Sequence, residues 1–173
     1  TSNQMEDIMS YLRFAAMIAT STVIMYGLMY LNTYQVDHVF YSQTRLWMAL
    51  LMGAVMAVIM LGFMWSMYKK RAMNLAIIAG AIAVFSGSLF LVRSQALVGD
   101  VDYMRAMIPH HSIAVLTSTN ANIRDARVRA LADEIIAAQV REIDEMKSLI
   151  ADLAANPPPA DAPVLTPRPV GGP

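Results

Sequence analysis

The chain has 173 residues, of which 57% are hydrophobic and 15% are charged, and its mean hydropathy is +0.45. Soluble domains carry about a quarter charged residues, so this composition excludes a wholly soluble globule and indicates a membrane protein. Lys and Arg number 13, as do Asp and Glu, and this lack of net positive charge argues against a nucleic-acid partner. The absence of Cys excludes disulfides, thiolate metal sites and cysteine nucleophiles.

Three uncharged runs divide the first half of the chain, and each is close to the ~20 residues that a helix needs to cross a bilayer. Tyr and Trp side chains lie near the ends of these runs, where amphipathic rings prefer the lipid headgroups. Residues 1–98 are therefore predicted to form a membrane domain. Its three transmembrane helices are expected at about 11–35, 46–68 and 72–97.

The basic residues predict how these helices are oriented. Lys69-Lys70-Arg71, between the second and third runs, is the densest basic cluster in the chain, and basic loops favour the cytoplasmic side. This places the N-terminus in the cytoplasm and everything after Arg93 outside it. The expected location is a bacterial inner membrane, with the C-terminal part in the periplasm and the lipid bilayer as one partner.

Charged residues return after the third run, and 99–156 is predicted to be a separate module of two helices. Asp100, which follows a glycine, predicts a helix break and an N-cap, with a first helix over about 101–118. Asp125 is expected to cap a second helix that ends near Asn156, because apolar residues recur there at helical spacing. The predicted fold class is all-α, with three transmembrane helices followed by an extracytoplasmic two-helix hairpin.

Most of the prolines lie in the last segment, 157–173, which is predicted to be an extended or disordered tail. The hairpin before it is small, and domains below about 40–60 residues rarely stand without support. It is therefore expected to pack on the membrane domain, on a second copy in a homo-oligomer, or on another subunit of a membrane complex.

The module opens with methionine and histidine side chains that are suited to bind a soft metal. Met104, Met107 and His111 are spaced i, i+3 and i+7, so they share one face of a helix. Pro109 is expected to kink this helix, and the kink would turn His110 toward the same site.

The second helix repeats this spacing with Gln139, Glu142 and Met146, so the two faces can meet in an antiparallel hairpin. Thioether and imidazole groups without Cys suit Cu(I) and, through the imidazole, Cu(II). The alternative stays open that the methionines fill a core and the histidines are structural.

Two blocks of the module carry a resemblance to a known family. Residues 107–111 read Met-Ile-Pro-His-His, and 131–146 read LADEIIAAQVREIDEM. In these blocks the stretch from Tyr103 to Leu153 resembles the bacterial domain of unknown function 305 family, which includes CopM-like copper-binding proteins. The resemblance implies half of a ferritin-like helical bundle and a part in periplasmic copper binding and tolerance. It implies as metal ligands Met104, Met107, His110, His111 and Met146, with Gln139 and Glu142 beside them.

Methionine also recurs at every fourth residue of the second membrane run, at Met48, Met52, Met56, Met60 and Met64. Such a row either passes Cu(I) toward the outer module or packs as a ridge against a neighbouring helix. The third run instead carries small residues, which permit close helix contact within the chain or between subunits. These are Ala76, Ala79, Gly80, Ala83 and Gly87.

The sequence therefore favours a membrane-anchored periplasmic protein that binds copper, more readily Cu(I) than Cu(II), in copper tolerance, storage or delivery. The alternative is a non-catalytic accessory or assembly subunit of a larger membrane complex, with a structural histidine pair. Catalysis has no positive signal, because the motifs of zinc proteases, di-iron bundles, serine hydrolases and P-loop enzymes are missing. Copper-dependent oxidation is the one catalytic alternative left.

Overall fold

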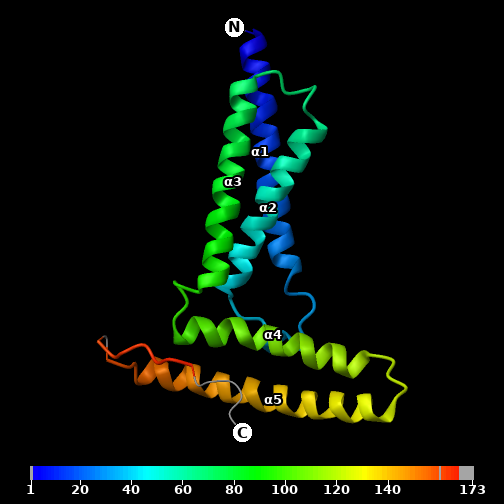
Figure 1. The fold of residues 1–173 in the computed structure, drawn as a ribbon, viewed down its shortest axis with the longest axis vertical. Helices are drawn as coiled ribbons and strands as arrows, with labels where there is room; N and C mark the ends of the chain where they lie inside the picture. Colours follow the sequence, from blue (N-terminus) through cyan, green and yellow to red (C-terminus); the bar gives the residue numbers. More distant parts are fainter. Residues whose placement is uncertain (1, 160, 168–173) are drawn as a thin grey trace.

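The computed structural model of the chain describes residues 2–159 and 161–167, and every regular element in them is helical. This confirms the predicted all-α class. Three long helices stand side by side as a column, and two further helices lie across its lower end (Figure 1). The elements are α1 (Ser2–Leu28), the short 3-10 helix η1 (Val36–His38), α2 (Gln43–Phe63), α3 (Arg71–Ser94), α4 (Asp100–Asn120) and α5 (Ala126–Ala155).

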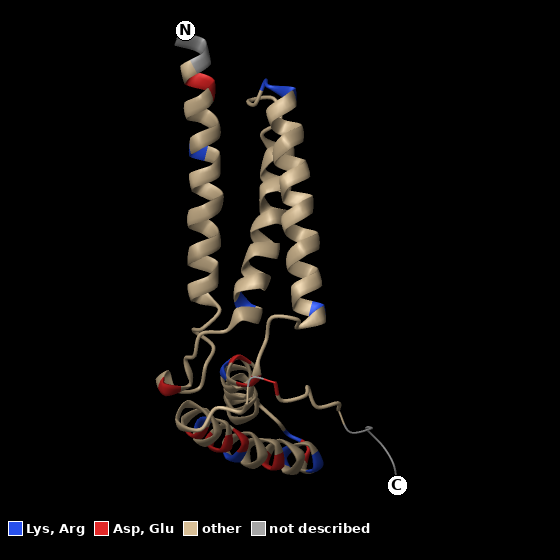
Figure 2. Cartoon of the chain, turned by 90° about the vertical axis from the view of Figure 1, so that its left-hand side faces the viewer, with Lys and Arg blue, Asp and Glu red and all other residues tan. Residues whose placement is uncertain are grey.

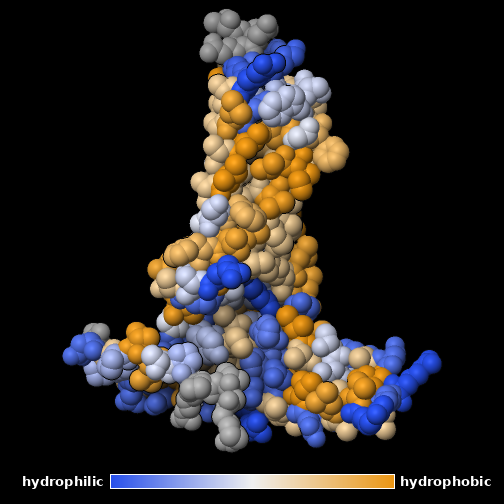
Figure 3. Space-filling model, in the orientation of Figure 1, coloured by the Kyte–Doolittle hydropathy of each residue, from blue (hydrophilic) through white to orange (hydrophobic). Residues whose placement is uncertain are grey.

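The column consists of α1, α2 and α3, each with a segment long and apolar enough to cross a membrane. Figure 3 shows the hydrophobic surface of the column above the more hydrophilic α4 and α5. The three expected helices are therefore present, although α1 ends earlier than the expected 11–35. Beyond it the chain turns: Tyr30 donates its amide three residues back, and the Arg45 guanidinium donates to the Met29 carbonyl at 2.6 Å. These bonds satisfy carbonyls that a helix end leaves free.

Helix α3 packs against α2 and buries small or polar side chains at seven-residue spacing, namely Asn74, Ala81 and Ser88. The small-residue face that the sequence marked for close packing is exposed instead, at Ala76, Ala79, Gly80, Ala83 and Gly87. Contact within the chain therefore uses a different side of α3 and leaves this face open.

Helix α1 packs against α2, and α1, α2 and α3 together line an apolar groove of about 590 Å³. The approach of α1 to α2 is close at Gly53, where a Cβ would collide with the Thr22 side chain. Toward the α2–α3 turn, the Tyr11 hydroxyl donates to Asn74 Oδ1 at 2.7 Å, and Asn74 Nδ2 donates to the Tyr68 carbonyl at 2.8 Å. Because polar groups away from water need partners, this link holds the α2–α3 turn against α1.

At the other end of the column, α4 and α5 pack against each other, and α4 also lies against α2 and η1. This arrangement is consistent with the predicted hairpin. Gly99, rather than the expected Asp100, occupies the N-cap of α4. Asp100 instead stands in the first turn, where a carboxylate interacts favourably with the helix dipole. Asp125 caps α5 as expected and accepts a hydrogen bond from the Arg127 amide at 2.8 Å.

The predicted tail is described only in part. Residues 157–159 and 161–167 follow α5 and contain no helix or strand. The remainder of the predicted tail, at 160 and 168–173, lies outside the described residues.

Candidate metal centre

Between α4 and α5 the module has an open groove of about 450 Å³, which we call the module groove. Its lining brings together five of the seven site residues expected from the sequence: three thioethers, one imidazole and one carboxylate. Met104, Met107 and His111 come from α4, while Glu142 and Met146 come from α5. Residues three, four and seven apart lie on one side of a helix, so the two expected faces form the two walls.

His111 links the two walls, and both of its ring nitrogens are engaged. Its Nδ1 lies 3.0 Å from the Met107 carbonyl oxygen, and its Nε2 lies 2.8 Å from Glu142 Oε2. A carbonyl oxygen only accepts, so the Nδ1 contact is a hydrogen bond donated by the ring. The Nε2 contact is a hydrogen bond to the Glu142 carboxyl, or an ion pair when the imidazole is charged. The Nδ1 bond fixes the ring with Nε2 toward the groove, as outer hydrogen bonds orient metal-binding imidazoles.

The methionine side chains of the module groove are shielded from solvent. Met104 is 6% exposed, and Met107 and Met146 are half-buried. Ile108 and Ile143, one from each helix, are 0% and 1% exposed and belong to the packed interior of the hairpin. The thioethers therefore project from two helices whose spacing is held by buried apolar side chains.

Two expected site residues do not reach the module groove. His110 is exposed, and its ring centroid lies 6.0 Å from that of His111. Helix α4 runs unbroken through Pro109, so no break turns His110 inward, and adjacent residues of a helix point to different sides. Gln139 is half-buried but does not line the groove.

Acidic side chains surround the thioethers. Asp100, Glu145 and Asp152 line the groove together with Glu142, and no Lys or Arg does. A cleft lined by one sign of charge attracts counter-ions, here cations. Within the described residues no three His, Asp or Glu side chains gather to hold a metal ion, so a metal in this groove depends on sulfur. Sequence reasoning selected Glu142 but missed the other three carboxylates, although Asp100 stands one helical turn before Met104.

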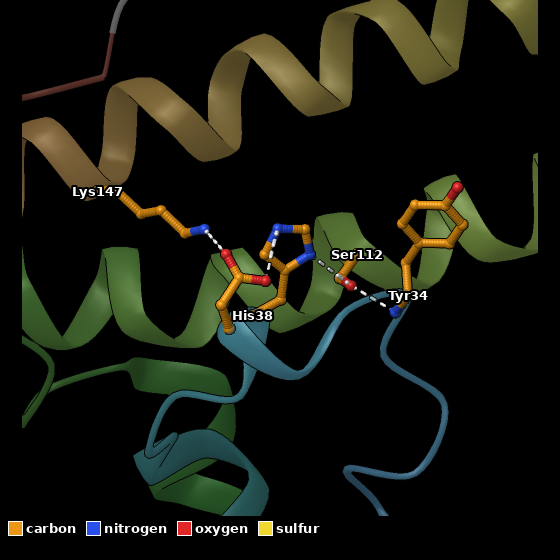
Figure 4. Close-up of polar contacts among 5 residues, drawn as sticks. Tyr34, His38, Ser112 and Lys147 are labelled. Carbon is orange, nitrogen blue, oxygen red and sulfur yellow. Dashed lines mark hydrogen bonds and ion pairs between the residues drawn. The ribbon is translucent and has the colours of Figure 1, made fainter.

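A polar joint beside the groove fastens α4 to the connection between α1 and α2 (Figure 4). Ser112 is fully buried, and its Oγ accepts a hydrogen bond from the Tyr34 amide at 2.7 Å. The same Oγ lies 3.0 Å from Nδ1 of His38, which is itself buried. Sequence reasoning did not select these residues, and only the position of His38 in a short connection hinted at them. The joint sets the position of His111, which adjoins Ser112.

Charges on α5 complete this joint. Lys147 Nζ donates to Asp37 Oδ2 at 2.7 Å, and the bond lowers the pKa of Asp37. Burial lowers the pKa of His38, and the charge of Lys147 lowers it further, whereas Asp37 and Asp144 act in the opposite direction. The loop before α2 thus contacts both helices of the module, with His38 favoured in its neutral form.

Known proteins resemble the C-terminal part of the chain. Residues 100–166 match the family described as "Domain of unknown function (DUF305)", which confirms the resemblance predicted from the two sequence blocks. An "Uncharacterized protein L153" of Acanthamoeba polyphaga mimivirus is 39% identical over 64 residues, which cover 36% of this chain and 42% of the relative. The chain thus spans less than half the length of that relative. No solved structure matches the chain.

Proposed function

We propose that the chain is a membrane-anchored copper-binding protein whose module groove holds the metal outside the cytoplasm for copper tolerance, storage or delivery. The observation that carries the proposal is the meeting of three thioethers and one imidazole in a groove whose other lining residues are four carboxylates, one tyrosine and two leucines. No comparison names a ligand or an activity, so the proposal stands on this donor set.

The donor set favours Cu(I). Thioethers are soft ligands that select Cu(I), and imidazole serves copper in both oxidation states. Met104, Met107, Met146 and His111 would hold the ion, with the metal in place of the proton at His111 Nε2. Glu142 Oε2, which lies 2.8 Å from that nitrogen, would move aside to admit the ion and would then compensate its charge. Binding and release of the ion make or break no covalent bond of a substrate, so the proposed role is not enzymatic.

The charge distribution supports the proposed orientation. Lys69, Lys70 and Arg71 lie at the end of the column away from the module (Figure 2). With this basic turn in the cytoplasm of a bacterial cell, the module would face the periplasm across the inner membrane.

The test is copper content after loading the detergent-purified chain with Cu(I) under a reductant. We expect His111→Ala to lose the copper of the module groove, while the matched variant His110→Ala retains it because His110 is exposed and outside the groove. Equal copper in both variants and the wild type would refute the site.

A milder variant guards against misfolding of the hairpin. Glu142→Gln keeps the side-chain size and removes the charge that faces His111 Nε2. We expect the loss of this nearby negative charge to weaken Cu(I) binding, measured by competition with a Cu(I) chelator. An unchanged affinity would mean that Glu142 has only a packing role.

A second candidate function is that of an accessory subunit in a homo-oligomer or larger membrane complex. It is favoured by the exposed small-residue face of α3 and by the two hydrogen-bonding contacts of His111, which also fit a structural histidine. Small residues permit close approach of helices in a bilayer. This candidate predicts a fixed partner on gentle purification and no copper dependence of that association.

A further inference from the structure

A second groove rich in methionine lies at the opposite end of the column, where α1 begins and α2 turns into α3. We call it the tip groove; its volume is about 610 Å³. Five thioethers line it, three from α1 and two from the α2–α3 turn: Met5, Met9, Met17, Met64 and Met67. No residue is shared with the module groove, and Figure 1 shows the two regions at opposite ends of the molecule.

Packing explains only part of this cluster. Met64 packs against the buried Phe14, Leu61 and Tyr68, as a core methionine does. Met5 and Met67, in contrast, are 66% and 63% exposed, so they gain little from burial within the chain.

Contact with lipid tails does not explain the exposure of Met5 and Met67 either. Asp7, between Met5 and Met9 on α1, lies 3.4 Å from Lys70 of the turn, and this pair marks the level of charged groups. Charged side chains are costly in hydrocarbon and collect at its edge. Met5 and Met67, each within three residues of this ion pair, stand at that edge.

The lining is chemically specific. It contains no imidazole, and Glu6 and Arg13 on its walls have opposite charges, so it neither repels nor strongly attracts cations. Thioethers are weak ligands for hard ions and suitable ligands for Cu(I). We propose that the tip groove is a second metal site, which binds a soft monovalent cation, Cu(I), through methionine sulfur alone. The proposal goes beyond the module groove and does not depend on metal binding there.

The experiment measures copper per chain and its ligands in the full-length protein. The chain is loaded with Cu(I) in detergent under ascorbate without oxygen, and bound copper is measured by plasma mass spectrometry. The tip variant changes Met9, Met64 and Met67 to Leu; the matched control changes Met48, Met52 and Met56, which line neither groove. Met-to-Leu exchange nearly conserves side-chain volume.

We expect the tip variant to lose one copper equivalent and the matched control to lose none. In His111→Ala, which lacks the imidazole of the module groove, X-ray absorption of the remaining copper should show sulfur neighbours without an imidazole pattern. Unchanged copper in the tip variant, or complete loss of copper in His111→Ala, would overturn the tip site. If the tip variant loses copper and His111→Ala loses none, the result would support the tip site and refute the proposed function of the module.

Discussion

The module groove and the tip groove are both lined by methionine, yet they are built in different ways. The module groove lies within one pair of consecutive helices and adds an imidazole and four carboxylates to its thioethers. The tip groove joins the start of α1 to the α2–α3 turn, which are distant in sequence, and its only charged lining residues are one acidic and one basic side chain. Methionine by itself therefore does not define a site, and the groups beside it determine what each groove can bind.

The methionine row of α2 provides the third case. Met60 and Met64 pack against the core of Phe14, Leu61 and Tyr68, and the other members of the row are half-buried. Methionine thus fills space in the core at some positions and lines an open groove at others. Transfer of copper along this row stays a prediction of the sequence.

The largest expected effect is a loss of folding stability that is confined to the helices of the module groove. Ile108→Ala leaves a cavity at a side chain that is 0% exposed and should cost about 2–5 kcal/mol in the free energy of unfolding of the module. Hydrogen exchange of α4 and α5 should accelerate, while that of α2 and α3 stays unchanged. Val128→Ala, at a residue that is 50% exposed, is the control. Equal acceleration in α2 and α3 would show that the two regions unfold together.

The next effect separates α1 from α2 at Gly53 and reaches the tip groove through α1, which supplies one of its walls. A side chain at position 53 would collide with Thr22, so Gly53→Leu should push α1 from α2 at a cost of about 1–3 kcal/mol. Copper bound at the tip should decrease and copper in the module should persist. Gly62→Leu, in the same helix but with open space around it, is the matched control. Retention of tip copper in Gly53→Leu would show that the groove does not depend on this contact.

Acidification should distinguish the two proposed sites chemically. An imidazole must be unprotonated at the nitrogen that binds a metal, whereas thioethers do not titrate. If each bound ion displaces one proton, the affinity of the module groove for Cu(I) should fall about tenfold for each unit by which the pH decreases under acidic conditions. Affinity of the tip groove should stay constant. Chelator competition on His111→Ala and on the tip variant checks this contrast, and parallel pH profiles would contradict it.

The smallest effect concerns the joint that holds the module. Burial and Lys147 lower the pKa of His38 in the docked state, so the undocked state takes up the proton first as pH falls below 6.5. The stabilisation is present above that value and is lost as the pH decreases toward the lowered pKa, although Asp37 and Asp144 counteract part of the shift. Hydrogen exchange of the Tyr34 amide, corrected for its intrinsic pH dependence, should therefore lose protection. His38→Asn should abolish the pH dependence, and a persistent dependence would assign it to another group.

Much of the architecture was predictable because it depends on local composition. Uncharged runs of sufficient length specify membrane helices, and Asp125 specifies the start of α5 through its own side chain. The helical spacing of Met104, Met107 and His111 likewise places these side chains on one face before any partner is known.

Contacts between distant segments were not predictable in the same way. His110 was expected at the site, but an unbroken α4 directs it to solvent. The joint of Tyr34, His38 and Ser112 joins residues more than 70 positions apart, and nothing local in the sequence selects that pairing.

The sequence by itself determined the helices, their apolar character and the two methionine-bearing faces of the module, because period and hydropathy act within a few turns of one helix. Only the tertiary structure decided which thioethers share a groove, that His111 rather than His110 joins Glu142, and that methionines of α1 meet those of the α2–α3 turn. The reason is that rotation and register between helices depend on contacts such as Gly53 against Thr22, which no single helix encodes.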